Sequence, residues 1–547
     1  MPESRRSRPV APALVVVALL AAAPLCWKLG DRYLWQDEAQ TAVLAERWLE
    51  LGRPLAYDGR NLLTLDVHEV LTPEAARRIH SDAVAAVQHY ARRGDFRADT
   101  TWTAHPWGQF AAAALSMRLL GKGTWQARLP FALMGIATVV LLFALARRRF
   151  ADPLVAPLAV ALLLGNVYWI LHARQCRYYA ASTLLLLVTL AAWLRWQDGK
   201  RFGAAGFVAA AWCWFQFDYG SVWPGVGVLL AEALRRAWPH PRAPLLAGLA
   251  FALCVAPFAW FYRITDRLQP PAVAWWERFF GTASLVDHYV LAVPLVAAIL
   301  AWLAARGRTR PEEARLLALS VALLAAFLVW VPISTQYPFH RYVVALTPIG
   351  CLLAGWLIAE LARLAPTRAA QLAVALALAS LVILTPLASL PFSWLVPGRY
   401  SQTGSHEGWR RIELGLYAAE LADLLPDPNR ILITALAERL APGDEVLTNL
   451  EDYPVMFYTD ARVRGGIPGF RIEAADGVAP RFAILWPSST VSPIGPFVAA
   501  TRRHRWREVP VEAPDIPGSN IPDPAFRPLL RETPAGSIVF LERELAP

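Results

Sequence analysis

The stretch VAPALVVVALLAAAPLCWKL, residues Val10–Leu29, is the first long apolar segment of this chain, and Trp35-Gln36-Asp37-Glu38-Ala39 follows it closely. The segment is apolar except for Lys28 and is long enough to cross a bilayer core of about 30 Å. Three arginines lie among the first eight residues, so the positive-inside rule places the amino terminus in the cytoplasm. The acidic pair Asp37–Glu38 is therefore expected just outside the membrane, on its far face.

Composition predicts a polytopic α-helical membrane protein. Hydrophobic residues make up 56% of the 547 residues and charged residues only 18%, which excludes an ordinary soluble globule. Apolar runs of about 20 residues recur along the chain. We predict about 11 transmembrane helices, at residues 10–29, 126–146, 154–171, 178–196, 203–217, 221–234, 243–262, 285–305, 316–332, 341–363 and 370–390.

The basic residues support this assignment of the spans. They cluster at 147–149, 195–201, 235–242, 306–315 and 363–368, in loops that the assignment places on the cytoplasmic side. The net charge of +10 therefore indicates membrane anchors, and no nucleic-acid partner is expected. The agreement requires that residues 107–121 do not span. Their apolar run is short and polar in places, so we predict an amphipathic helix on the outer surface.

Two alternatives concern the first segment and the metal content. Ala21-Ala22-Ala23 resembles a signal-peptide cleavage site, but the apolar run is longer than a signal core of about 7–15 residues, which favours a retained anchor. The five cysteines lie in or beside apolar segments and form no Cys-x-x-Cys, so neither a disulfide framework nor a zinc ribbon is predicted. No cofactor is predicted with certainty, and a divalent metal stays an open alternative.

The chain divides into two predicted domains. Residues 1–390 form the transmembrane module, in which residues 30–126 are an external first loop with juxtamembrane helices, one of them near 73–93. Residues 391–547 are rich in proline and mixed charge and predict a small extracytoplasmic α/β domain. Its expected strands are Glu445–Leu447, Phe482–Leu485 and Ile538–Leu541, and its expected helices are Tyr417–Leu425 and Ile431–Arg439.

Four polar clusters are expected at the outer face. They are Asp37-Glu38; His105-Pro106-Trp107; the segment from His172 through Arg174 and Arg177 to Tyr178-Tyr179; and Tyr337 to Tyr342, which contains His340-Arg341. Repeated arginines at a membrane boundary indicate anionic partners such as lipid phosphate. A carboxylate pair facing such cations is the arrangement expected of a transferase that uses a lipid-phosphate donor, because the carboxylate deprotonates an acceptor hydroxyl while the cations hold the departing phosphate.

Several of these motifs resemble GT-C glycosyltransferases of the protein O-mannosyltransferase and aminoarabinose (lipid A) transferase type. The resemblance covers roughly residues 10–390. The matching elements are Trp35-x-Asp37-Glu38-Ala39 before a helix ending Leu51-Gly52, His105-Pro106-Trp107, Gly121-x-Gly123-x-Trp125-Gln126-Ala127-Arg128-Leu129-Pro130, Gln175-x-Arg177-Tyr178 and Arg341-Tyr342.

The resemblance implies roles for specific residues. Asp37 is expected to be the general base toward the acceptor, and Glu38 to shape the same catalytic site. The expected donor-phosphate ligands are His105, Arg174, Arg177 and Arg341, and the expected substrate-pocket residues are Tyr57, Tyr178 and Tyr342. Two departures stand out: Trp107 replaces the second proline that relatives carry after His105, and Tyr178-Tyr179 stand where relatives often have a second aspartate.

Each candidate also has a structural interpretation. Asp37 could be a helix N-cap with Gln40 as its capping-box partner, and Glu38 a solvated charge in the first turn. His105 could simply start the surface helix. Arg174 and Arg341 could be interfacial anchors. Tyr337 and Tyr342 could belong to an aromatic belt. Asp218, between two short spans, is more simply explained as a hydrogen-bonded turn.

We therefore expect a multi-pass glycosyltransferase of the cell inner (plasma) membrane, with a cytoplasmic amino terminus and an extracytoplasmic carboxyl-terminal domain. Its expected donor is a polyprenyl-phosphate-linked hexose or pentose, and its acceptor a hydroxyl of a lipid, glycan or protein. A transporter or flippase of lipid-linked sugars is a rival, although no paired halves with interrupted helices are visible in the sequence. A non-catalytic membrane scaffold is the other.

Overall fold

The computed structural model describes residues 10–65, 83–267, 274–291, 310–335, 338–385, 414–422, 426–465, 480–487, 502, 504–516 and 536–544. The chain forms two compact units that do not follow its order. The helical unit comprises Met1–Trp27, Phe131–Trp260 and Ile264–Leu421. The mixed unit comprises Lys28–Pro130, Phe261–Arg263 and Ala422–Pro547, so it joins the first loop to the carboxyl-terminal tail.

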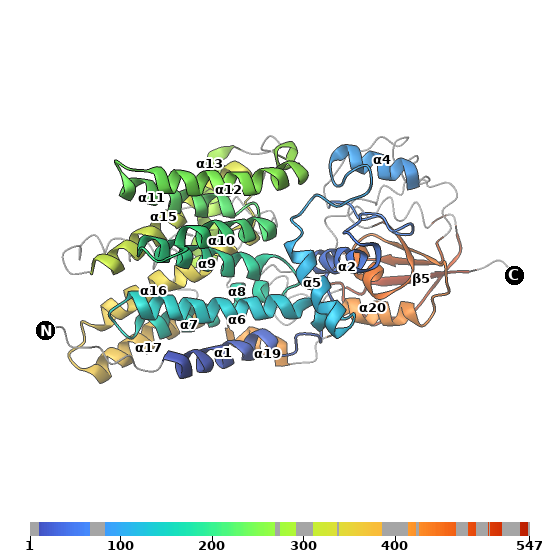
Figure 1. The fold of residues 1–547 in the computed structure, drawn as a ribbon. Coiled ribbons are helices and arrows are strands. Elements are labelled where there is room, and N and C mark those ends of the chain that lie inside the picture. The colour runs from blue at the N-terminus through green and yellow to red at the C-terminus, as the bar shows by residue number, and fades with distance from the viewer. Residues whose placement is uncertain are drawn as a thin grey trace. The chain divides into compact units, whose positions relative to one another are not determined.

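The helical unit consists of apolar helices that run side by side (Figure 1). In chain order the helices from the first segment to residue 422, other than those of the first loop, are α1 (Val10–Cys26), α6 (Thr124–Arg149), α7 (Val155–Leu164), α8 (Val167–Ala173), α9 (Tyr179–Gln197), α10 (Gly203–Phe217), α11 (Val222–Ala237), α12 (Arg242–Phe261), η1 (Ile264–Arg267), α13 (Trp275–Val290), α15 (Pro311–Ser334), η2 (His340–Leu346), α16 (Thr347–Ala362), α17 (Arg368–Leu384) and α19 (Leu414–Ala422).

Among the described residues, five helical segments are long and apolar enough to cross a membrane. They are Thr124–Arg149, Tyr179–Gln197, Arg242–Phe261, Pro311–Ser334 and His340–Ala362. The pair α7–α8 adds a sixth if it is counted as one bent span, and Ala11–Cys26, Gly203–Phe217 and Arg368–Leu384 are shorter apolar helices. The chain is thus mostly helical with several apolar helices, and the total of 11 spans stays a prediction.

The predicted span at 154–171 is broken, which corrects the expectation of one continuous helix. The axes of α7 and α8 differ by 71°. The break lies at Gly165–Asn166, where the Asn166 side chain accepts a hydrogen bond from the Trp169 backbone at 3.1 Å and so starts a new helix. Gly165 packs closely against α17: a Cβ there would lie 2.7 Å from Ile383.

The predicted span at 285–305 differs from the structure at its start. The helix α13 begins at Trp275, ahead of the predicted start at residue 285, and ends at Val290. Residues 292–305 of the predicted span lie outside the described residues. The helix that the sequence placed on the membrane surface at 107–121 is α5 (Gly108–Leu120), whose 13 residues extend about 20 Å, too short to cross a bilayer core.

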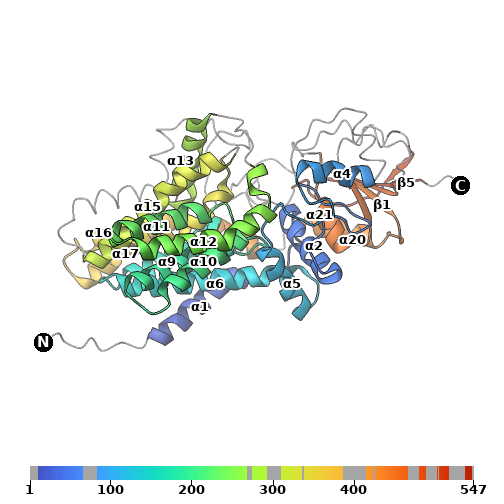
Figure 2. The same cartoon turned by 45° about the horizontal axis from the view of Figure 1, so that its top comes forward.

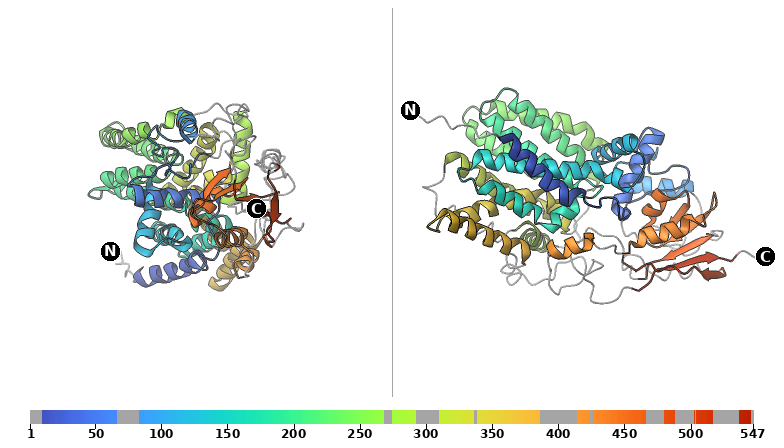
Figure 3. Two further views of the ribbon diagram at one scale, coloured as in Figure 1. Left: turned by 90° about the vertical axis from the view of Figure 1, so that its right-hand side faces the viewer. Right: turned by 90° about the horizontal axis from the view of Figure 1, so that it is seen from below.

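The tail contributes a five-stranded sheet to the mixed unit. Its strands are β1 (Glu445–Thr448), β2 (Arg462–Gly465), β3 (Phe482–Leu485), β4 (Trp506–Glu508) and β5 (Val539–Arg543). The order is β2-β1-β3-β5-β4, with β1 parallel to β2 and β3, and β5 antiparallel to β3 and β4. Helices α20 (Pro428–Ala437) and α21 (Asp452–Tyr458) lie beside the strands (Figure 2). The right-hand view of Figure 3 shows the strands side by side.

The first loop contributes the helix that carries the Asp37-Glu38 motif. This helix, α2 (Gln36–Leu51), packs against α5 and α21. It ends at Gly52, whose left-handed φ of 80° lets its N–H return to the Trp48 carbonyl at 3.0 Å. A second loop helix, α4 (Ala83–Arg93), covers the end of the predicted helix at 73–93; residues 73–82 lie outside the described residues.

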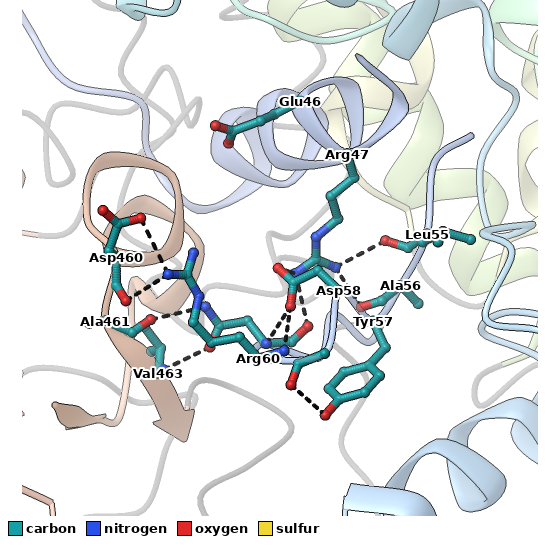
Figure 4. Close-up of polar contacts among 12 residues, drawn as sticks. Glu46, Arg47, Leu55, Ala56, Tyr57, Asp58, Arg60, Asp460, Ala461 and Val463 are labelled. Carbon is teal, nitrogen blue, oxygen red and sulfur yellow. Dashed lines mark hydrogen bonds and ion pairs between the residues drawn. The ribbon is translucent and has the colours of Figure 1, made fainter. Parts of the chain in front are cut away.

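Arg47, on α2, is the centre of a buried polar network that orders the loop after α2 (Figure 4). Its guanidinium donates to the carbonyls of Leu55 at 3.0 Å and Ala56 at 2.6 Å, and to the Asp58 carboxylate at 2.7 Å. It also donates to the Asn61 carbonyl at 2.8 Å. One side chain thus satisfies three backbone carbonyls and one carboxylate of a segment without regular structure.

The loop ordered by Arg47 is tied directly to the tail (Figure 4). The Asn61 amide donates to the Ala461 carbonyl at 3.0 Å, and its oxygen accepts from the Val463 backbone N–H at 2.8 Å. The Arg60 guanidinium donates to the Asp460 carbonyl at 2.7 Å. These residues are about 400 positions apart in the chain, yet they form one continuous set of hydrogen bonds beside strand β2.

The tail also holds the residues that lead into α2. The backbone N–H of Tyr33 donates to the Asp427 carboxylate at 2.6 Å, and the Leu34 N–H donates to the Tyr458 hydroxyl at 3.0 Å. The Leu34 carbonyl accepts from the Asn429 amide at 3.3 Å. The rings of Tyr33 and Tyr458 stack with their centroids 4.0 Å apart.

Two buried acids of the tail contact the first residue of α2. The Gln36 amide donates to the Asp452 carboxylate at 2.6 Å, and the Gln36 backbone N–H donates to the Glu451 carboxylate. Burial raises the pKa of the Asp452 carboxyl from 3.8 to about 7. Burial also holds the pKa of the Glu451 carboxyl well above its usual range, and the nearby charges of Asp452 and Asp37 add to that rise.

The raised pKa of Asp452 predicts a pH-dependent stability. Between pH 3.8 and about pH 7 the unfolded chain releases this proton while the folded chain keeps it, so stability falls as pH rises through this window and levels off above it. Asp452→Asn keeps an acceptor for Gln36 but removes the titration. We expect the melting temperature of this variant, measured in detergent, to fall less between pH 5 and pH 7 than that of the wild type.

Asp460→Asn is the matched control, because the Asp460 side chain is 98% exposed. It should keep the wild-type dependence on pH. Parallel melting curves for the wild type and Asp452→Asn across this range would contradict the assignment.

Candidate active site

Asp37 lies in the first turn of α2 and is half-buried. The helix begins at Gln36 and its N-cap is Trp35, whose backbone is extended and whose side chain makes no capping hydrogen bond. The interpretation of Asp37 as an N-cap with Gln40 as its partner is therefore wrong. The Asp37 carboxylate is left as a side chain of the first turn, partly open to its surroundings.

Glu38 is buried in an ion pair and is not the solvated first-turn charge that one interpretation of the sequence allowed. It is 1% exposed and pairs with Arg128 through two hydrogen bonds, of 2.8 and 2.6 Å. The same guanidinium donates to the carbonyls of Leu29 at 3.0 Å, Arg32 at 2.8 Å and Tyr33 at 3.2 Å. Glu38 therefore fixes the first turn of α2 to the segment before it, next to Asp37.

The acids Glu451 and Asp452 are functional candidates that sequence reasoning missed. Both are 3% exposed and both contact Gln36, the neighbour of Asp37, and the Asp37 charge acts on Glu451. The available signal was an acidic pair just after the predicted strand at 445–447. It carried no motif, because only the fold brings it to a helix more than 400 residues earlier.

His105 is part of an aromatic cluster of the mixed unit. Its Nδ1 accepts a hydrogen bond from the Trp102 indole at 3.3 Å, and the two rings stack with centroids 6.0 Å apart. Trp107 donates its indole N–H to the Trp102 carbonyl at 2.8 Å. Its ring meets those of Trp48 at 5.4 Å and Phe261 at 5.2 Å. An acceptor role for Nδ1 assigns the proton of a neutral imidazole to Nε2.

Tyr57, an expected substrate-pocket residue, makes a local contact. Its hydroxyl donates to the Gly59 carbonyl at 2.8 Å, at the surface of the loop that Arg47 orders (Figure 4). Its place in the substrate pocket stays a prediction.

In the helical unit, Arg174 contacts the carboxyl-terminal end of α1. Its guanidinium donates to the carbonyl of Pro24 and, at 2.5 Å, to that of Trp27. These are helix-end carbonyls without an intrahelical partner, and a cation there also complements the helix dipole. The contact favours the anchoring interpretation of Arg174 over phosphate binding.

The other candidates of the helical unit come together from two distant segments. Arg177 is buried, at 3% exposure, in the turn between α8 and α9. Tyr178, at the start of α9, lies within electrostatic range of Arg341 and Tyr342 from η2. The Arg341 guanidinium lies 4.7 Å from the Phe339 ring centroid and 5.8 Å from that of Tyr342. Arg341, Tyr342 and Tyr178 thus form one cluster, and its role as a shared substrate site stays a prediction.

Two histidines lie beside this cluster. The rings of His172 and His340 are 5.3 Å apart, and His172 is also 4.8 Å from the Tyr179 ring. His172 is fully buried, its Nδ1 lies 2.7 Å from the Tyr168 carbonyl, and its Nε2 has no hydrogen-bond partner among the described residues. Because a carbonyl can only accept, Nδ1 carries the proton.

Asp218 forms the hydrogen-bonded turn that the sequence favoured. Its carboxylate accepts from the hydroxyls of Ser182 at 2.7 Å and Ser221 at 2.5 Å, and from the backbone N–H of Gly220 at 3.0 Å. The turn joins α10 to α11 and fastens both to α9.

The predicted residues therefore fall into two groups, one in each compact unit. Asp37, Glu38, His105 and Tyr57 belong to the mixed unit, and Arg174, Arg177, Tyr178, Arg341 and Tyr342 to the helical unit. Within the part of the chain that the structure describes, no group of three or more His, Cys, Asp and Glu side chains is placed to hold a metal ion. The mixed unit offers a half-buried carboxylate suited to a general base, and the helical unit offers a cation flanked by aromatic rings.

Sequence comparison matches part of the chain to a known family. The sequence model of the dolichyl-phosphate-mannose-protein mannosyltransferase family matches residues 104–261, a stretch that contains His105-Pro106-Trp107 and Arg128. No curated protein sequence matches the chain at a significant level.

Two solved structures share the fold. The crystal structure of ArnT from Cupriavidus metallidurans bound to undecaprenyl phosphate is similar over 98% of this chain and 98% of that chain, with a TM-score of 0.56 and 15% sequence identity. The apo state of the same protein is similar over 97% of each chain, with a TM-score of 0.56 and 14% identity. The resemblance found in the sequence is thereby confirmed: this chain is a multi-pass membrane protein that resembles the GT-C glycosyltransferases, in sequence over residues 104–261 and in fold over almost its whole length.

Proposed function

We propose that this protein is a membrane glycosyltransferase that moves a sugar from a polyprenyl-phosphate donor to an acceptor hydroxyl at the extracytoplasmic face. The observation that carries the proposal is the match of residues 104–261 to the mannosyltransferase family, within a chain that shares the fold of a protein solved with undecaprenyl phosphate bound. The sugar is a hexose or pentose, and the acceptor is a lipid, a glycan or a protein.

In this proposal Asp37 is the general base. It takes the proton of the acceptor hydroxyl while the acceptor oxygen forms a bond to the anomeric carbon of the sugar, and the bond from that carbon to the phosphate oxygen breaks. The polyprenyl phosphate departs with the bonding electrons, and cations stabilise its charge. Direct displacement of this kind inverts the anomeric configuration.

Among the cations of the helical unit, Arg341 is the strongest candidate for the donor phosphate. Its side chain is partly exposed, and its guanidinium lies against the rings of Phe339 and Tyr342. The other proposed ligands of the donor phosphate are Arg177 and His105. The proposed pocket residues are Tyr178, Tyr342 and Tyr57, and Glu38 supports the base.

The proposed topology follows the charge distribution. The protein has about 11 spans in the inner membrane, a cytoplasmic amino terminus and an extracytoplasmic α/β domain formed by the tail. The rival functions are transport or flipping of lipid-linked sugars and a non-catalytic scaffold. A transporter would move labelled donor into vesicles without transferring the sugar, and a scaffold would do neither.

Replacing the base should abolish transfer without unfolding the protein. Purified protein in nanodiscs would be given undecaprenyl-phosphate-linked radiolabelled sugars, with membranes as the source of acceptors. We expect Asp37→Asn to lower the rate of sugar transfer by about 100-fold or more, because no carboxylate then takes the proton of the acceptor hydroxyl. The melting temperature should stay near that of the wild type. The exposed Asp31 of the same unit provides the matched control, Asp31→Asn, which should transfer normally. Wild-type rates in Asp37→Asn would remove Asp37 as the base.

We expect the binding of the donor phosphate to depend on Arg341 and not on Arg174. We expect Arg341→Gln to weaken the binding of undecaprenyl phosphate by about 10-fold or more, because a charge-assisted hydrogen bond is lost, and to leave the binding of undecaprenol unchanged. Native mass spectrometry in detergent measures both ligands. Arg174→Gln should lower the melting temperature and keep the phosphate affinity. The reverse pattern, with phosphate affinity lost only in Arg174→Gln, would contradict this assignment.

A further inference from the structure

Three of the four residues directly before Asp37, namely Tyr33, Leu34 and Gln36, are held by hydrogen bonds from the tail. Hydrogen bonds from the tail satisfy the backbone N–H groups of Tyr33, Leu34 and Gln36 and the carbonyl of Leu34. The Gln36 side chain is bound as well, because its amide meets Asp452 and its oxygen accepts from the Tyr453 N–H at 3.4 Å. The tail thus fixes both the path of the chain and the start of the helix that carries Asp37.

Glu451 supplies the capping hydrogen bond that the side chain of the N-cap residue, Trp35, does not make. The first N–H groups of a helix lack intrahelical partners, and the N-cap Trp35 offers no side-chain acceptor. The Glu451 carboxylate accepts the Gln36 N–H and is itself held by the Asn429 amide at 2.9 Å. A carboxylate from the tail therefore caps the helix of the first loop.

The backbone of Glu451, the residue that makes this contact, adopts a strained conformation. Its φ is 57°, in the left-handed region that residues with a side chain rarely adopt. The next residue, Asp452, starts helix α21, so the two carboxylates project from a tight turn between β1 and α21. Both are 3% exposed, and buried acids have a desolvation cost that their contacts with Gln36 and Asn429 partly offset. Backbone strain and buried acids concentrated at one contact are typical of functional positions.

We propose that Glu451 and Asp452 are positioning residues for Asp37: they cap and clamp the first turn of α2 from the tail and hold the Asp37 carboxylate in its productive orientation. The inference rests on the proposed function of Asp37 as the base, and it gives the tail a role in the reaction. The tail acts on Asp37 through its contacts with Gln36, so its effect is on geometry. A displacement of about 1 Å at a catalytic group can lower a rate by about 100-fold.

The test compares apolar and isosteric variants in the transfer assay. Asp452→Leu and Glu451→Met remove the acceptors, whereas Asp452→Asn and Glu451→Gln keep an oxygen toward Gln36. We expect the apolar variants to lose about 10-fold to 100-fold in kcat with little change in the KM for donor, and the isosteric variants to restore most of the loss. Asp460→Leu, at the exposed acid of the same unit, is the matched control and should keep the wild-type kcat.

Two further experiments test the positioning role even if a tail variant does not fold or shows no activity. Gln36→Ala removes the contact from the α2 side, so it should reproduce the loss in kcat even where an apolar tail variant fails to fold. Hydrogen exchange measures the geometry without any activity: in Gln36→Ala and the apolar variants the amides of residues 36–40 should exchange faster, while those of residues 43–51 keep their protection.

The outcomes separate this inference from the proposed function. If the wild type transfers sugar, Asp37→Asn does not, and Asp452→Leu and Gln36→Ala keep the wild-type kcat, the positioning role is overturned and the proposed function stands. If the wild type transfers no sugar, the proposed function fails, and hydrogen exchange alone decides whether the tail orders the Asp37 turn. Unchanged exchange at residues 36–40 overturns the inference in every case.

Discussion

The buried ion pair between Glu38 and Arg128 determines the geometry of the candidate site. Arg128 is 12% exposed and Glu38 is 1% exposed, so both charges have lost most of their water, and only good geometry compensates such a loss. The compensation comes from two hydrogen bonds to Glu38 and three to backbone carbonyls of residues 29–33. A single guanidinium therefore joins the segment after α1 to the first turn of α2, and this turn carries Asp37.

Within the mixed unit, buried polar contacts also join the first loop to the tail, two parts of the chain that are far apart in sequence. Arg47 and Asn61 join the first loop to strand β2, and Gln36 joins it to the acids at the start of α21. These contacts are polar and mostly buried, so they specify one alignment of loop and tail more strictly than apolar packing alone. In this account the tail is a structural part of the proposed catalytic site.

The parts of the structure that carry a local, periodic signal could be predicted from the sequence. The long apolar helices, the strands β1 and β3 and the helix behind Asp37 all lie where the pattern placed them. Features that depend on a single residue, or on a contact with a residue far away in the chain, could not be predicted from the sequence. Gly165 and Asn166 break a span within a continuous apolar run. The partners Glu38 and Arg128 are 90 residues apart, and Gln36 and Asp452 are 416 apart, so no periodicity reveals either pair. The acids of the tail were missed for this reason.

The Glu38–Arg128 pair fixes the first turn of α2, and a double-mutant cycle tests this role most directly. The free energy of unfolding in detergent would be measured for the wild type, Glu38→Gln, Arg128→Met and the double variant. A pair that acts as one unit predicts that each single change destabilises strongly and that the double variant costs little more, with a coupling of about 2 kcal/mol or more. Additive effects, within about 0.5 kcal/mol, would contradict the account.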